Sequence, residues 1–129
     1  LCLALLDIDN FKKLNDQLGH AVGDTALAHL AKVVQDTIRP EDTLARYGGE
    51  EFVVLLPDTA LENAVAAMTR VQRELTRRFF LHNNDKVLIT FSCGAVELGA
   101  AEDAAAGLQR ADAAMYLAKR AGKNRVMAG

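Results

Sequence analysis

The sequence is poor in cysteine. Its two cysteines, Cys2 and Cys93, lie in separate apolar segments, with no second Cys or His at metal-ligand spacing. We interpret both as small buried side chains in a reducing compartment, and we expect a cytoplasmic location. The sequence also lacks an apolar run of about 18 residues, the length that a membrane helix needs, so we expect no direct membrane contact.

An excess of charge of either sign is missing too. The 15 Lys and Arg residues nearly balance the 17 Asp and Glu residues, which leaves a formal net charge of −2. Surfaces that bind nucleic acid or anionic membranes usually carry a large basic excess, so we expect no nucleic-acid partner. Any anionic ligand must then be bound by a local arrangement of residues.

No low-complexity tract or internal repeat divides the 129 residues. Because the commonest domain size is about 100 to 150 residues, we expect one domain spanning residues 1–129. The chain starts abruptly inside the apolar run Leu1–Leu6. This start predicts that the domain comes from a longer protein.

The hydrophobic pattern predicts alternating strands and helices. Strands are expected at residues 1–6, 43–47, 52–56, 87–96 and 124–127, and helices at 11–18, 24–38, 61–79 and 108–118. We expect Asp9 or Asn10 to cap the first helix, Asp24 to cap the second, and residues 82–85 to form a loop. This order favours an α+β sandwich with helices packed on a mixed sheet.

The segment Arg46–Phe52 predicts the turn of a β-hairpin with unusual chemistry. Gly48 and Gly49 permit unusual backbone conformations and close approach of a ligand. Glu50 and Glu51 follow directly, and adjacent like charges repel unless water or a cation solvates them. The segment alone is equally compatible with an ordinary solvated turn.

A ferredoxin-like core would resolve this ambiguity. In that topology strand one lies antiparallel to strand three, so Asp7 would meet Glu50 and Glu51. Carboxylates that converge in this way require a hard cation with oxygen ligands, and Mg²⁺ is the expected one.

Phosphate groups have a candidate site beside these carboxylates. Backbone N–H groups at Phe11 and Lys12 open a helix whose positive end faces the same region. Lys119 and Lys123 lie four residues apart at the end of the last predicted helix and can close over phosphates. The alternative is that both lysines are solvated and merely complement the helix dipole.

Together these segments resemble the GGDEF domain, the catalytic domain of bacterial diguanylate cyclases, in its variant with Glu in the third place of the signature. The resemblance covers nearly the whole chain and rests on four segments at family spacing. They are Gly48-Gly49-Glu50-Glu51-Phe52, the run from Asp7 to Asp16, Leu18-Gly19-His20 with Gly23-Asp24, and Ala111-Asp112 through Tyr116 to the run Lys119–Asn124.

The resemblance implies a palm fold similar to that of adenylyl cyclases, with a mostly antiparallel five-stranded mixed sheet flanked by helices. It implies that two GTP molecules are condensed into cyclic di-GMP (c-di-GMP) with release of two pyrophosphates by a homodimer. Asp7 and Glu50, with the Ile8 carbonyl, resemble ligands of two Mg²⁺ ions per site, with Mn²⁺ as a possible substitute. Glu51 resembles either a second metal ligand or the general base.

Further roles follow from the same resemblance. Asn15 and Asp24 match guanine-binding residues, although Asn15 alone is equally compatible with a locally bonded helix residue. Arg39 and Asp42 match an inhibitory product site. The phosphate contacts are matched by Phe11, Lys12, Lys119 and Lys123, the close main-chain approach by Gly48 and Gly49, and the second arginine of the inhibitory site by Arg70.

Two departures from the family and two alternatives stand beside this interpretation. The family more often has Arg at the position of Lys123, and its domains usually begin with a further helix that this chain lacks. A non-catalytic GGDEF domain that only binds GTP or c-di-GMP is one alternative. A different nucleotide cyclase or polymerase-like palm is the other, and Asn15 with Asp24 argues against it because this pair favours guanine.

Overall fold

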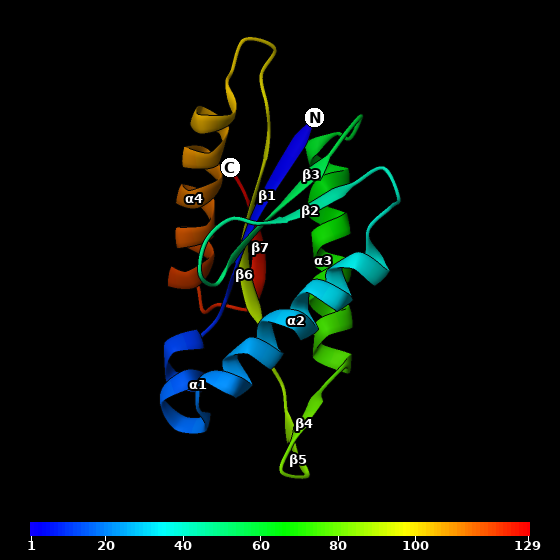
Figure 1. The fold of residues 1–129 in the computed structure, drawn as a ribbon. Helices are drawn as coiled ribbons and strands as arrows, with labels where there is room; N and C mark the ends of the chain where they lie inside the picture. Colours follow the sequence, from blue (N-terminus) through cyan, green and yellow to red (C-terminus); the bar gives the residue numbers. More distant parts are fainter.

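The computed structural model describes residues 1–129, which fold into four helices and seven strands (Figure 1). In chain order they are β1 (Cys2–Ile8), α1 (Phe11–Leu18), α2 (His20–Thr37), β2 (Thr43–Arg46), β3 (Glu51–Leu56), α3 (Leu61–Arg77), β4 (Phe80–His82), β5 (Asp85–Val87), β6 (Phe91–Glu97), α4 (Ala104–Arg120) and β7 (Arg125–Ala128).

Five of the strands form the central sheet, in the order β2-β3-β1-β6-β7. Every neighbouring pair is antiparallel except β6 and β7. The central strand β1 is buried along its whole length, as its uniformly apolar sequence predicts. The predicted α+β fold with a mostly antiparallel five-stranded sheet is confirmed.

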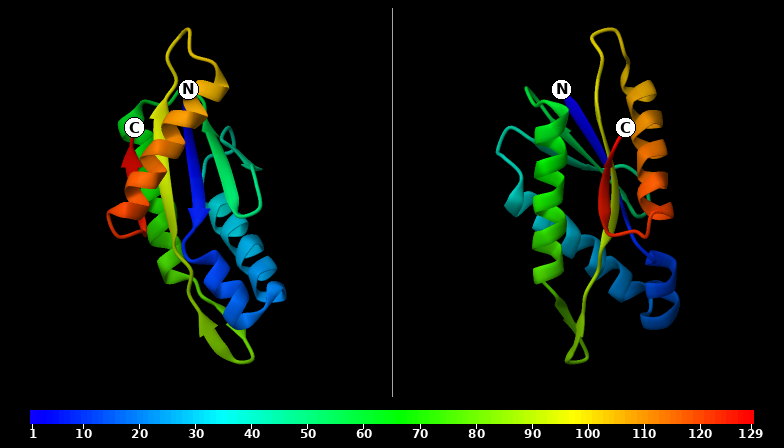
Figure 2. Two further views of the ribbon diagram at one scale, coloured as in Figure 1. Left: turned by 90° about the vertical axis from the view of Figure 1, so that its left-hand side faces the viewer. Right: turned by 180° about the vertical axis from the view of Figure 1, so that it is seen from behind.

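The two faces of this sheet are covered by different helices (Figures 1 and 2). α2 and α3 pack on one face over a core of 21 buried residues, and α4 packs on the other over six. Side chains of β1 alternate between the two cores because successive residues of a strand point to opposite faces. Cys2, Ala4, Leu6 and Ile8 belong to the larger core, and Leu3 and Leu5 to the smaller.

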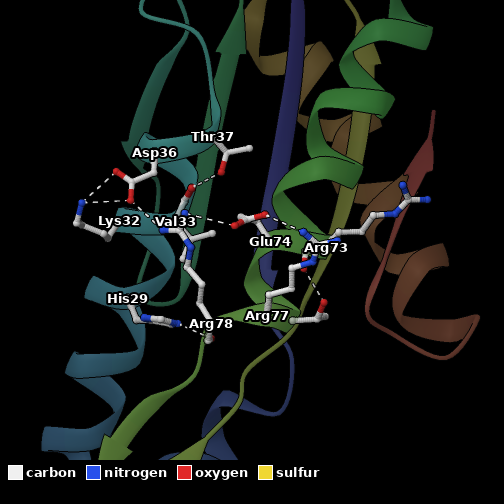
Figure 3. A network of polar contacts seen from close by, with 10 residues as sticks. His29, Lys32, Val33, Asp36, Thr37, Arg73, Glu74, Arg77 and Arg78 are labelled. Carbon is white, nitrogen blue, oxygen red and sulfur yellow. Dashed lines mark hydrogen bonds and ion pairs between the residues drawn. The ribbon is translucent and has the colours of Figure 1, made fainter.

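Polar side chains join α2 to the end of α3 (Figure 3). The Arg78 guanidinium donates hydrogen bonds to Asp36 of α2 at 2.9 Å and to Glu74 of α3 at 3.4 Å. His29 of α2 donates from Nε2 to the Arg78 carbonyl at 2.9 Å. Hydrogen bonds from Arg78 and Lys32 lower the pKa of Asp36. Partly exposed pairs add little stability, so the network mainly orients the two helices.

Residues 80–87 differ from the sequence-based prediction. The expected loop at 82–85 is the tip of a small hairpin in which β4 pairs with β5, and it projects from the end of the domain (Figure 1). Asn83 and Asn84 both adopt left-handed backbone angles, with φ of 50° and 68°, which is the conformation that two-residue hairpin turns need. The predicted strand 87–96 therefore starts later, at Phe91, and α3 ends at Arg77, before Phe79.

The predicted helix caps are also wrong in detail. α2 begins at His20, so Asp24 lies inside the helix and does not cap it. Gly19, with φ of 94°, turns the chain directly from α1 into α2. Asn10 precedes α1 in a left-handed conformation, but its side chain makes no capping hydrogen bond. The Asp9 side chain bonds elsewhere, to β6 and to the turn before β7.

Two remaining expectations concern the cysteines and the membrane. Cys2 and Cys93 are both free and buried, as predicted. Burial raises the pKa of the Cys93 thiol, so it stays protonated at neutral pH. Among the helices, none combines the length and the apolar character needed to span a bilayer.

Candidate active site

The carboxylates predicted to converge do lie together at one end of β1. The antiparallel register places Asp7 directly opposite Glu51, the first residue of β3, and Glu50 precedes it in the turn. Asp7 is buried, with only 4% of its surface exposed, whereas Glu50 and Glu51 are half-buried. The topology therefore produces an acidic cluster from Asp7, Glu50 and Glu51 at the edge between β1 and β3.

Lys119, in the last turn of α4, reaches this cluster on the face of the sheet that α4 covers, the face to which Leu3 and Leu5 also point. Its Nζ donates a hydrogen bond of 2.5 Å to Oδ2 of Asp7. Burial alone would lower the pKa of Lys119, but the bond to Asp7 and the charges of Glu50 and Glu51 raise it overall. Lys119 is thus a cation held among three carboxylates.

The surroundings disfavour the charged form of both glutamates. Burial, and then the charge of Asp7, raises the pKa of Glu50 and likewise that of Glu51. Lys119 acts in the opposite direction on both groups. A single ammonium therefore does not neutralise the acidic cluster, and the site favours additional positive charge.

This local chemistry fits a hard cation. Oδ1 of Asp7 is buried and has no hydrogen-bond partner. No three Asp, Glu, His or Cys side chains converge closely enough to bind a metal by themselves. Mg²⁺ sites commonly use one or two carboxylates and complete their shell with water and substrate phosphates. Asp7 and Glu50, with the main chain at Ile8, are the residues here that suit such a site.

The Gly-Gly turn is organised by a residue that sequence reasoning did not select. Arg46 donates from Nη2 to the Gly49 carbonyl at 2.5 Å and from Nε to the Gly48 carbonyl at 3.2 Å. The turn closes through the Tyr47 amide, which donates to the Glu51 carbonyl at 2.8 Å. A basic residue two positions before adjacent glycines was the available signal, because their carbonyls are accessible acceptors.

The predicted reason for the two glycines needs correction. Neither Gly48 nor Gly49 adopts a left-handed φ, so the turn does not require glycine on conformational grounds. A Cβ atom at Gly49 would meet nothing within 4 Å, and one at Gly48 would only touch Glu51 at 3.6 Å. The glycines leave open space beside the main chain, which is what close approach of a ligand needs.

The residues predicted to bind phosphate surround the β1–α1 turn. Phe11 and Lys12 begin α1, and Lys12 is exposed. Lys123, in the turn after α4, donates from Nζ to Oδ1 of Asn10 at 2.7 Å. Lys119 therefore contacts the end of β1, and Lys123 contacts the residue before α1, the helix whose start was predicted to bind phosphate.

Asn15 and Asp24 flank the contact between α1 and α2. Oδ1 of Asn15 is buried and lacks a hydrogen-bond partner, and it lies against Gly23, where an added Cβ would collide with it. Asp24, the next residue of α2, is exposed. A hollow of about 310 Å³ begins at Asp24 and runs between α2 and the β2–β3 hairpin. Its other lining residues are Leu27, Ala28, Ala31, Arg46 and Phe52.

The residues predicted for product inhibition also lie together, away from the acidic cluster. Arg39 donates to Asp42 from both Nε and Nη2, at 3.4 and 3.1 Å, and to Thr59 at 2.8 Å. The hydrogen bonds that Arg39 donates to Asp42, and the negative charge of Asp42, raise the pKa of Arg39. A hollow of about 250 Å³ is lined by Arg39, Asp42, Asp58 and, from α3, Arg70.

Comparison with known proteins identifies the class to which this fold and this site belong. The family model described as "Diguanylate cyclase, GGDEF domain" matches residues 1–125. The chain therefore belongs to the GGDEF domain family of diguanylate cyclases.

Individual relatives agree. Diguanylate cyclase A of Treponema denticola is 39% identical over 127 residues, covering 98% of this chain and 34% of that protein. The chain thus spans about a third of the length of this curated relative.

Solved structures match the fold closely. The GGDEF domain of DgcB from Caulobacter crescentus, solved in complex with c-di-GMP, is 38% identical with a TM-score of 0.93, over 98% of this chain and 76% of that one. The active GGEEF domain of a diguanylate cyclase from Vibrio cholerae is 34% identical with a TM-score of 0.84, over 98% of this chain and 81% of that one. The second of these is a GGEEF domain, and the same signature stands here at residues 48–52.

Proposed function

We propose that this domain is a diguanylate cyclase that condenses two GTP molecules into c-di-GMP and two pyrophosphates. The observation that carries the proposal is the acidic cluster, in which Asp7 retains an unpaired buried oxygen beside two glutamates of raised pKa. Such a cluster costs stability in the free protein, and a cation with bound phosphates offsets that cost. GTP supplies the phosphates and implies a cytoplasmic location.

Asp7, Glu50 and the Ile8 carbonyl are the proposed ligands of Mg²⁺, two ions per site, with Mn²⁺ as a substitute. When bound, the ions polarise the α-phosphate and lower the pKa of the attacking hydroxyl. Glu51 accepts the proton of the ribose 3′-hydroxyl in this proposal, or serves as a further ligand. A raised pKa suits the first role, because a general base works best when its pKa lies near the operating pH.

The covalent step takes place between two GTP molecules and needs no further reactant. The 3′-oxygen of one GTP forms a bond to the α-phosphorus of the other, and the bond from that phosphorus to its β-bridging oxygen breaks. Pyrophosphate leaves with the bonding electrons, and the 3′-hydroxyl proton goes to the base. Two such attacks in opposite directions close the ring.

One domain of this size offers one acidic cluster, so the two attacks require two domains. We propose a homodimer in which the clusters face each other across a two-fold axis. Tyr47, at the start of the Gly-Gly turn, is 56% exposed and is available for contact with a partner domain. Proximity of two bound GTP molecules then replaces a bimolecular encounter.

Nucleotide selectivity is assigned to Asn15 and Asp24. The N1 and N2 groups of guanine are donors, and a buried unpaired amide oxygen together with a carboxylate are matching acceptors. The apolar walls of the hollow beside Asp24 suit a base. Phe11, Lys12, Lys119 and Lys123 take the phosphates, and Gly48 and Gly49 leave room for the nucleotide.

Product inhibition is proposed at Arg39, Asp42 and Arg70. Two arginines at one hollow present planar donors that suit phosphate groups and the acceptor edge of guanine. The complex of the Caulobacter relative with c-di-GMP is consistent with product binding to this kind of domain.

The test is to incubate the purified domain with Mg²⁺ and GTP over a range of protein concentrations, measuring c-di-GMP and pyrophosphate. We expect both products, with specific activity rising with protein concentration. Glu50→Gln should abolish synthesis, whereas Glu62→Gln, at an exposed position in the first turn of α3, is the matched control.

Three outcomes decide between the proposal and its alternatives. GTP binding without pyrophosphate release at any concentration would favour a non-catalytic binding module. Equal turnover of ATP would favour another type of nucleotide cyclase. Synthesis by Glu50→Gln at the parent rate would contradict the assigned site.

A further inference from the structure

We infer that Asp9 is a positioning residue for nucleotide binding: its carboxylate holds the turn that carries Lys123 against the β1–α1 turn. The inference rests on the proposed function, because Lys123 is a phosphate contact in it. The hydrogen bonds of the Asp9 carboxylate go to Thr90, Ser92 and the Asn124 amide and not to the acidic cluster, and none of the roles assigned above uses Asp9.

The carboxylate of Asp9 is buried and fully engaged, with 8% of the residue exposed. Oδ1 accepts a hydrogen bond from Ser92 at 2.6 Å, and Oδ2 accepts one from Thr90 at 2.7 Å. Oδ2 also accepts the backbone N–H of Asn124 at 2.9 Å. Asp9 thus joins three segments: the end of β1, the start of β6 and the turn between α4 and β7.

The turn that Asp9 holds has a strained backbone. Gly122, Lys123 and Asn124 all have positive φ, of 121°, 66° and 49°. Glycine adopts such angles freely and asparagine at small cost, so Lys123 in particular needs support from the surrounding structure. That support comes from the Lys123 amide, which donates to the Ala118 carbonyl at 3.0 Å, and from the Asn124 amide on Asp9.

This geometry fixes where the Lys123 side chain can reach. The Lys123 backbone is held at its own amide and at the next one, and its Nζ then bonds Asn10, the neighbour of Asp9. Asp9 and Asn10 are adjacent, so one short segment anchors both the backbone of the turn and the end of the lysine. Loss of the Asp9 acceptor would free the turn and withdraw Nζ from the helix start.

An ionised carboxylate suits this position better than an amide. All three neighbours act as donors, and an amide in the same place would offer only one oxygen and would direct an NH₂ group at a donor. Asp9→Asn therefore conserves size but offers one acceptor oxygen to three donors, none of which has a second acceptor.

A second contact supports the same turn from outside the core. Gln72 of α3 donates from Nε2 to Oδ1 of Asn124 at 2.8 Å. Gln72→Ala removes this hydrogen bond at the protein surface and leaves the buried hydrogen bonds of Asp9 intact. It provides a milder test that does not depend on whether Asp9→Asn folds.

The experiment is a double-mutant cycle on nucleotide affinity. The probe is 3′-deoxy-GTP with Mg²⁺, because it lacks the attacking hydroxyl and binds without turnover, and its dissociation constant is measured by calorimetry. The variants are Asp9→Asn, Lys123→Met and their combination, followed by Gln72→Ala alone and with Lys123→Met. The matched control is Asp103→Asn, a carboxylate that caps the far end of α4 through the Ala106 amide.

We expect Asp9→Asn and Lys123→Met each to weaken binding about 10-fold, the size of one charge-assisted contact, and the double variant to bind like Lys123→Met alone. Gln72→Ala should weaken binding roughly 2- to 3-fold, and only while Lys123 is present. Asp103→Asn should leave the affinity unchanged and Tm nearly so, because Asn caps a helix about as well as Asp.

Two results would overturn the inference. The first is an unchanged affinity for 3′-deoxy-GTP in both Asp9→Asn and Gln72→Ala. The second is that each of these substitutions weakens binding by the same factor with and without Lys123→Met, which would mean a general structural role. If Asp9→Asn does not fold, the Gln72→Ala cycle decides alone. Failure of the parent to bind 3′-deoxy-GTP would instead contradict the proposed function, so the two failures are distinguishable.

Discussion

Lys119 and Asp7 are separated by 112 positions in the chain, yet Nζ of Lys119 donates a hydrogen bond to Oδ2 of Asp7. The other carboxylate oxygen of Asp7, Oδ1, has no hydrogen-bond partner. The pair joins the end of α4 to the end of β1 on the face of the sheet that α4 covers. It also shows that the acidic cluster is only partly compensated in the free protein, and this has measurable consequences.

The first prediction concerns Glu50 and stability. Burial and the charge of Asp7 raise the pKa of Glu50 above its ordinary value of 4.5. A raised carboxyl pKa means that the folded state keeps its proton longer, so the free energy of unfolding falls as pH rises from 4.5 through the folded-state pKa. Without metal at pH 7.5, Glu50→Gln should therefore raise Tm by about 1 to 4 °C, a range that allows for solvent screening.

Thermal melts in a chelator, in a pH series that extends from neutral pH to below the ordinary Glu pKa of 4.5, test this prediction. The difference between variant and parent should shrink as the pH is lowered, and a constant difference would argue against the electrostatic cause. Added Mg²⁺ with 3′-deoxy-GTP should reverse the order, because ligand binding stabilises the parent by about 2.7 kcal/mol at 100 times its dissociation constant and the variant by less.

The second prediction concerns Gly23. Alanine normally stabilises a helix interior relative to glycine by about 1 kcal/mol. A Cβ at this position would instead collide with Oδ1 of Asn15 and displace it. Gly23→Ala should weaken GTP binding by roughly 3- to 10-fold, the worth of one hydrogen bond, while ATP binding stays as weak as before. Competition binding with both nucleotides measures the ratio, and an unchanged ratio would remove Asn15 from guanine recognition.

The third prediction concerns the proposed inhibitory site. Arg70→Ala should weaken c-di-GMP binding by about 10- to 100-fold, because hydrogen bonds to charged groups contribute about 1.5 to 3 kcal/mol. Arg73→Ala, one turn further along α3 and outside the hollow, is the matched control. Calorimetry with c-di-GMP on both variants provides the comparison, and equal affinities would place the product elsewhere.

The fourth prediction concerns Lys123. Arginine offers a planar bidentate donor where lysine offers a point charge, so Lys123→Arg should tighten phosphate binding. We expect a KM for GTP about 2- to 5-fold lower, a fraction of one charge-assisted hydrogen bond, with little change in kcat. Initial rates at several GTP concentrations measure both constants. A higher KM would show that the left-handed turn at Lys123 cannot present the larger head group.

Local sequence patterns predicted the four helices and the main strands, whereas the acidic cluster was expected only for a ferredoxin-like core and the five-stranded sheet only from the family resemblance. The run from Cys2 to Ile8 is apolar throughout because β1 is central, and the antiparallel register that follows from the topology brings Asp7 to Glu51. The Gly-Gly turn with its two glutamates was recognised as a candidate site from the sequence alone. These features depend on periodicity and strand order, which the sequence carries directly.

The tertiary structure alone decided the contacts between distant residues. Nothing local to Asp9 indicates that it accepts from Thr90, Ser92 and the Asn124 amide, up to 115 positions away. The same holds for Lys119 on Asp7 and for the fit of Asn15 against Gly23. A side chain's partners depend on how separate elements pack, and periodicity within one element contains no information about that packing. The chemistry of the acidic cluster was therefore readable from the sequence, and the supports that hold its lysines in place were not.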